Sequence, residues 1–110
     1  MHYLEEELTS KYGFDSNILM ILSNKVISGI WFWDLENPEE EYFDDQFWLT
    51  LGYDPKEMPQ KSDVWQSLVF EEDLQLAIKL VQEHIENPSI AYKQVLRYKH
   101  KQGHTIYIHC

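Results

Sequence analysis

The sequence predicts an α+β fold, in which short helices and one long helix cover one face of an antiparallel β-sheet and N-terminal helices stand in front. Three observations lead to this prediction. An aromatic segment near residue 30 is typical of a strand, and residues 71–86 have the apolar spacing of a helix. Two further strand-like runs, joined by a turn that contains Gly103, close the chain.

The composition supports one domain with a real core. The chain has 110 residues, of which 44% are hydrophobic and 15% aromatic, which is enough apolar material for one core. The formal net charge of −10 argues against binding to nucleic acid or to anionic membrane surfaces.

The expected compartment is the cytoplasm. The single cysteine, Cys110, cannot form an internal disulfide bond, so nothing argues for secretion. The sequence has no apolar run of the roughly 18 residues that a membrane span needs. Glu5, Glu6 and Glu7 stand where a signal peptide would be basic and then apolar.

Two helices are expected at the N-terminus. Leu4, Leu8 and Tyr12 lie at helical spacing, and a second helix is expected to begin at Asp15 or Ser16 and to end near residue 28. We interpret residues 1–28 as a helical segment that provides a packing or dimer surface, and residues 29–110 as the domain proper.

A hairpin and several short helices follow. The segments 30–35 and 41–43 are expected to be strands, separated by the turn signal Glu36-Asn37-Pro38. Asp44 is expected to cap a helix that ends at Gly52, and Asp54-Pro55-Lys56-Glu57 is a second helix start.

The second half of the chain is expected to hold the longest elements. A short helical turn should begin at Ser62 or Asp63, and the long helix should span 71–86 until Asn87-Pro88 ends it. Strands are expected over 92–100 and 105–110.

Four motifs together resemble a known family. Gly29–Leu35, Leu51–Glu57, Trp65–Leu74 and Tyr98–His104 are similar, in order and spacing, to the motifs of PAS domains of the PAS_3 type. The resemblance covers residues 18–110. It implies the PAS fold, whose sheet has five strands.

The chain departs from the family pattern at three places. Phe70-Glu71 stands where His-Pro is common, and Gln102 replaces the usual Asp of the turn. The chain also ends at Cys110, where the family continues into a fifth, central strand. Either the chain is a truncated piece of a longer protein, or a second chain or the N-terminal segment fills the gap. We expect truncation together with dimerisation.

The resemblance implies a role in signalling. The expected function is sensing or signal relay in a larger bacterial-type protein, such as a sensor histidine kinase of a two-component system or a cyclic-dinucleotide enzyme. The domain would act by binding a small molecule or by repacking a homodimer, and would pass the change to an output domain. The alternative is a dimerisation module without a ligand.

The aromatic residues are the candidates for a ligand pocket between sheet and helices. By family analogy Phe32 occupies a position that is usually polar, so Trp31 and Trp33 should face the helix-covered side. The competing interpretation is that these rings simply fill the core. The candidate pocket residues are Trp31, Trp33, Phe47, Trp48, Met58, Trp65, Leu80, Gln94, Leu96 and Tyr98.

Other chemistry has weak support in the sequence. No catalytic motif is present, so an enzyme is not expected. His84 lies too late in the long helix for the haem ligand of the family, and covalent flavin chemistry lacks its cysteine. His100 and His104 flank the last turn, where surface histidines are more common than a metal site, and His109 and Cys110 point to opposite faces of a strand. No haem, flavin or metal is therefore expected.

Overall fold

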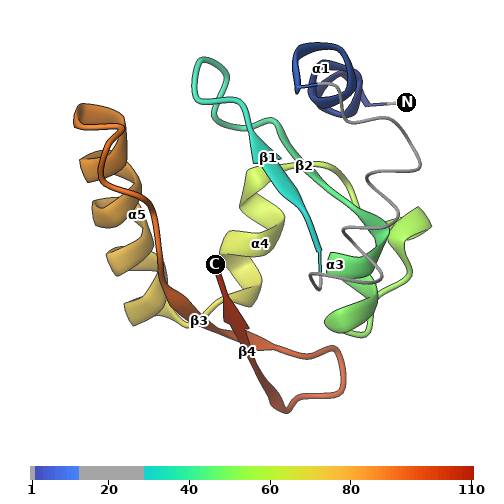
Figure 1. The fold of residues 1–110 in the computed structure, drawn as a ribbon. Coiled ribbons are helices and arrows are strands. Elements are labelled where there is room, and N and C mark those ends of the chain that lie inside the picture. Colours follow the sequence, from blue (N-terminus) through green and yellow to red (C-terminus); the bar gives the residue numbers. More distant parts are fainter. Residues whose placement is uncertain (1, 13–28) are drawn as a thin grey trace. The chain divides into compact units, whose positions relative to one another are not determined.

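The computed structural model describes residues 2–12 and 29–110 (Figure 1). These residues form two compact units, 1–64 and 65–110, and each is described by itself. The first contains helix α1 (Tyr3–Tyr12), strands β1 (Trp31–Trp33) and β2 (Glu41–Phe43), helix α3 (Asp45–Thr50) and the 3-10 helix η2 (Pro55–Glu57). Helix α4 (Ser62–Leu68) spans the boundary, and the second unit continues with helix α5 (Glu71–Glu86) and strands β3 (Val95–Lys99) and β4 (Thr105–His109).

The fold is α+β, as predicted. The elements follow the predicted order, although the second N-terminal helix falls outside the described residues. The predicted boundary between the N-terminal segment and the domain, at residues 28 and 29, lies at the edge of the described residues and stays a prediction. The strands form two separate two-stranded antiparallel sheets, β1-β2 and β3-β4, where a single sheet was expected. In the family resemblance, the strand that joins these two hairpins is the fifth one.

Helix α1 packs on one face of the β1-β2 hairpin. The register pairs Phe32 with Tyr42, which places both side chains on the same face. Tyr42, Leu4 and Leu8 are buried together there, and Phe32 packs against them. The helix therefore stabilises the hairpin by burying the face that carries Phe32.

The short helices begin where the sequence predicts. The Asp44 carboxylate accepts a hydrogen bond from the Phe47 N–H at 3.1 Å and caps α3. Gly52 follows α3 with a φ of 87°, a conformation that glycine adopts without strain. Asp54 caps η2 by accepting from the Lys56 N–H at 3.0 Å.

Replacement of the α3 cap provides a first prediction. Asp44→Ala should lower the free energy of unfolding by about 1 kcal/mol, because the Phe47 N–H loses its acceptor. Asp45→Ala is the matched control, since it removes a charge from the same helix end but no cap, and its cost should be a few tenths of a kcal/mol. Urea denaturation measures both. Equal losses in the two variants would contradict the capping role of Asp44.

In the second unit, an ion pair joins the start of α5 to β3. Helix α5 spans the predicted residues, and Phe70 before it makes no side-chain cap. Asp73 instead reaches β3, where its carboxylate accepts bonds from the Arg97 N–H at 2.7 Å, from Nε at 3.0 Å and from Nη2 at 2.9 Å. Strand β3 begins at Val95, later than predicted, and Gln94 before it still exchanges backbone hydrogen bonds with Cys110.

Candidate ligand-binding site

The second face of the β1-β2 hairpin carries the aromatic residues of the predicted pocket. Trp31 pairs with Phe43 and Trp33 pairs with Glu41, so these four side chains share the face opposite α1. Phe43 stacks on Phe47 of α3, with ring centroids 4.7 Å apart. Trp31 and Trp33 thus lie on the side of the strands that carries a packed aromatic cluster, while Trp31 itself remains 38% exposed.

Trp48 lies at the centre of this cluster. Its ring is fully buried, 5.0 Å from the Phe43 ring and 4.9 Å from the Phe47 ring. Within residues 2–12 and 29–110, its indole Nε1 has no hydrogen-bond partner. A buried donor without an acceptor lowers the stability of the fold by about 1–3 kcal/mol, so such groups are uncommon in native proteins. An acceptor atom on a bound molecule would satisfy it.

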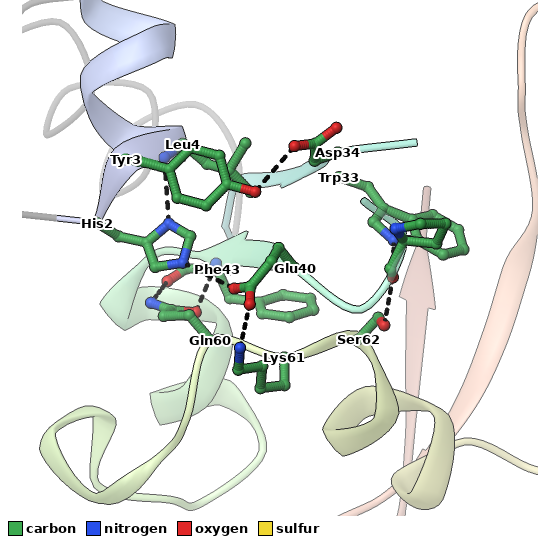
Figure 2. A network of polar contacts seen from close by, with 11 residues as sticks. His2, Tyr3, Leu4, Trp33, Asp34, Glu40, Phe43, Gln60, Lys61 and Ser62 are labelled. Atoms are coloured by element: carbon green, nitrogen blue, oxygen red, sulfur yellow. Dashed lines mark hydrogen bonds and ion pairs between the residues drawn. The ribbon is translucent and has the colours of Figure 1, made fainter. Parts of the chain in front are cut away.

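Trp33 provides a contrast within the same unit. Its Nε1 donates to the Pro38 carbonyl at 2.6 Å, and the Ser62 hydroxyl donates to the same oxygen, also at 2.6 Å (Figure 2). The indole N–H of Trp33 is thus used by the fold itself. Of these two indoles, Trp48 is the one whose N–H has no acceptor among the described residues.

Residues 60–62 complete the outer edge of β2. The Gln60 side chain accepts from the Phe43 N–H at 2.9 Å and donates to the Phe43 carbonyl at 2.8 Å, as a neighbouring strand would (Figure 2). Lys61 forms an ion pair with Glu40. The hydrogen bond from Lys61 Nζ to the Glu40 carboxylate lowers the pKa of that carboxyl. No local sequence pattern marks Gln60 and Lys61, because their partners lie 17 and 21 residues away along the chain.

A groove of about 290 Å³ lies between α1 and the β1 side of the hairpin. Its walls include Glu7 and Lys11, which form an ion pair at 3.0 Å, and Asp34, which accepts a bond from the Tyr3 hydroxyl at 2.9 Å (Figure 2). Desolvation and this bond to Asp34 raise the pKa of Tyr3 to about 12. Trp33 is the only candidate pocket residue among the groove residues, which are Leu4, Glu7, Lys11, Phe32, Trp33, Asp34, Leu35 and Glu36.

The other predicted pocket residues divide between the two units. Met58 is half-buried after η2 in the first unit. In the second unit, Trp65, Leu96 and Tyr98 are buried and Leu80 is half-buried. The ten predicted pocket residues belong to both units. That they line one cavity stays a prediction.

Gln94 is engaged within its own unit. Its side-chain amide donates to the Asp73 carbonyl at 2.9 Å, and its oxygen accepts from the Tyr92 hydroxyl at 2.7 Å. These contacts tie the start of β3 to α5. The placement indicates a structural role, and a polar contact from Gln94 to a ligand stays a prediction.

The histidines of the second unit form local contacts. His84 Nδ1 lies 2.7 Å from the Ile90 carbonyl, which holds the ring against the loop after α5. The rings of His100 and His104 stack 4.1 Å apart across the last turn. Desolvation, and to a smaller extent His104, lowers the pKa of His100. Within the described residues, no three His, Cys, Asp or Glu side chains are placed to hold a metal ion.

Comparison with known protein families identifies the fold. A family model described as PAS fold matches residues 40–110, from just before β2 to Cys110. Neither the curated proteins nor the solved structures produced a match. Among the helices that the structure describes, none is long and apolar enough to cross a membrane.

Proposed function

The chain belongs to the PAS fold family, and from this premise we propose that it is a sensory and signal-relay module that binds a small molecule beside Trp48. The observation that carries the proposal is the fully buried indole N–H of Trp48, which has no acceptor among the described residues. A pocket that combines apolar rings with a few polar groups is the usual form of a small-molecule site.

The surroundings of Trp48 define the chemical class of the ligand. Phe43 and Phe47 surround the indole with apolar rings, and the indole N–H can donate one hydrogen bond. The ligand should therefore have a flat or apolar body and a carbonyl or carboxylate oxygen. The negative charge of the chain favours a neutral molecule over a multiply charged anion.

The mechanism that we propose is a change in packing. Trp48 contacts Phe43 of β2 and Phe47 of α3, so a molecule that moves the indole changes how the hairpin and α3 pack. Tightly packed elements move between discrete arrangements, which is how a small displacement becomes a signal. The output domain would belong to a longer cytoplasmic signalling protein, such as a sensor histidine kinase or a cyclic-dinucleotide enzyme, and the module would act as a homodimer without catalysis.

A ligand-free interaction module is the second candidate. The observation that favours it is the exposure of large apolar side chains in the second unit, where Leu76, Ile78 and Ile85 of α5 and Tyr107 of β4 are all exposed. Such residues are common at contact surfaces between proteins.

Native mass spectrometry of the purified chain distinguishes the two candidates. We expect a bound molecule that leaves on denaturation, and we expect Trp48→Phe, which keeps the ring but removes the N–H, to lower its occupancy at least about tenfold. Leu49→Ala, an exposed neighbour in α3, is the control and should keep the molecule. A dimer without a bound molecule would favour the interaction module, and a bare monomer would contradict the proposed dimer.

A further inference from the structure

The turn between β3 and β4, residues 100–104, is built around the imidazole of His100. The His100 N–H donates to the His104 carbonyl and the Gly103 N–H donates to the His100 carbonyl, both at 2.8 Å. Gly103 has a φ of 100°, as the glycine of a three-residue hairpin loop requires. The His100 side chain adds a third bond, because the Gln102 N–H donates to its Nδ1 at 3.0 Å. This is the bond, to the N–H two residues on, that Asn and Asp make in an Asx-turn.

The bond from Gln102 fixes which nitrogen of His100 carries the hydrogen. A backbone N–H can only donate, so Nδ1 must offer its lone pair, and the hydrogen of the neutral ring lies on Nε2. A further proton can then enter only at Nδ1, the atom that accepts from Gln102. Protonation of His100 therefore turns this acceptor into a donor, and the Gln102 N–H loses the bond.

The surroundings of His100 also oppose the charged ring. The rings of His100 and His104 stack with centroids 4.1 Å apart and planes 21° apart, so a charge on one disfavours a charge on the other. Lys99 precedes His100 and Lys101 follows it, while β3, the turn and β4 contain no Asp or Glu. Desolvation of the half-buried ring, and then His104, lower the pKa of His100 below its ordinary value of 6.5.

His84 shows the opposite arrangement in the same unit. Its Nδ1 lies 2.7 Å from the Ile90 carbonyl, and a carbonyl can only accept, so Nδ1 carries the hydrogen. A further proton enters at Nε2 and leaves this bond intact. Of these two histidines, His100 is the one whose contact depends on a neutral ring.

We propose that the β3-β4 turn is a pH-sensitive switch, which is closed while His100 is neutral and opens when a proton enters at Nδ1. The open turn has lost the bond from Gln102 and separates the rings of His100 and His104. The paired residues of β3 and β4 keep their backbone bonds, so the change should be confined to residues 100–104. The inference goes beyond the proposed function, which concerns Trp48 in the first unit, and gives the module a response to protons.

The lowered pKa of His100 sets the direction of the response. As the pH falls below the unfolded value of about 6.5, the unfolded chain binds a proton that the closed turn excludes. The closed turn therefore stabilises the fold fully above about pH 6.5, and this contribution is lost as the pH falls through the folded pKa. Acidification is the signal that opens the turn.

Nitrogen-15 NMR of the whole chain between about pH 5 and about pH 8 tests the switch. At the upper pH, the ring shifts of His100 should show the Nε2–H form, and its titration midpoint should lie below 6.5. The Gln102 amide should shift with the same midpoint, because protonation removes its acceptor. A neutral His100 in the Nδ1–H form, or a Gln102 amide that does not follow the ring, would overturn the proposal.

Two substitutions at one position separate the acceptor from the charge. His100→Asn places an amide oxygen where Nδ1 accepts, and this oxygen makes the same bond but does not titrate. The Gln102 amide of this variant should therefore stay constant from about pH 8 to about pH 5. His100→Ala has no acceptor, so its Gln102 amide should have the shift of the open turn at every pH. If the Gln102 amide of His100→Asn still titrates, another group is the source and the proposal fails.

His104→Gln tests the contribution of the neighbouring ring. The bond from Gln102 to His100 remains in this variant, so the Gln102 amide should still follow the ring. The titration midpoint of His100 should rise, because the charge that opposes its protonation is gone. An unchanged midpoint would overturn the role of the ring pair.

Thermal unfolding gives an independent measure of the same switch. Wild type should lose more of its Tm than His100→Asn between about pH 8 and about pH 5, by a few degrees, because only wild type has a turn that protonation opens. Equal losses in the two chains would overturn the proposed link between the turn and the stability of the fold.

Discussion

Trp48→Ala should lower the free energy of unfolding by about 3–5 kcal/mol, the largest loss that we expect from a single substitution. The ring is fully buried and contacts both Phe43 and Phe47, so its removal leaves a cavity in the centre of the aromatic cluster. Urea denaturation followed by circular dichroism measures the loss. Because a small domain has only about 5–15 kcal/mol of stability, the variant should be near its folding limit at 37 °C.

Leu49→Ala is the control for this prediction. Leu49 is the next residue of α3 and is exposed, so its truncation should change stability by no more than about 0.5 kcal/mol. A similar loss in both variants would show that α3 is sensitive to any change, and would contradict the central role of Trp48.

Trp48→Phe separates packing from hydrogen bonding. In a chain free of ligand, this variant removes an unsatisfied buried donor but also part of the ring, so it should cost less than Trp48→Ala. When the ligand is present, the Trp48→Phe chain should retain it more weakly, because the indole N–H is missing. If the indole donates to a ligand, the stability of Trp48→Phe and its retention of the ligand should respond differently. If Trp48 only fills space, the two should change together.

Asp73→Asn should lower the free energy of unfolding by about 1–3 kcal/mol at pH 7. The Asp73 carboxylate accepts from the Arg97 backbone N–H and from the guanidinium, and it thereby holds α5 against β3. The neutral amide keeps the shape of the side chain but loses the charge that strengthens these bonds. Glu72→Gln is the control, because Glu72 is more exposed and makes a single, longer contact of 3.4 Å with Arg97.

The effect of Asp73→Asn should depend on pH. The hydrogen bonds from the Arg97 side chain lower the pKa of Asp73 below its ordinary value. A carboxyl whose pKa falls on folding stabilises the native state above the unfolded pKa of about 4, and this contribution is lost as the pH falls through the folded value. The stability difference between wild type and Asp73→Asn should therefore be full at pH 7 and shrink below about pH 4. A difference that stays constant down to pH 2 would contradict the ion pair as its source.

The sequence by itself determined the local structure, because local signals act over a few residues. The caps Asp44 and Asp54, the glycine at 52 and the span of α5 follow from side chains that bond or strain the backbone beside them. Trp31 and Trp33 alternate with Phe32 in β1, so they share the face that carries the aromatic cluster of α3. The family motifs were equally local, and the match over residues 40–110 confirms the PAS fold.

Only the tertiary structure decided which polar groups are satisfied. Gln60 completes the edge of β2, and Asp73 anchors β3, through contacts that span 17 and 24 residues. Such partners depend on how distant segments meet, which no local pattern encodes. For the same reason, the sequence identified Trp33 and Trp48 as equivalent pocket residues. The fold supplies an acceptor to the first indole and none, among the described residues, to the second.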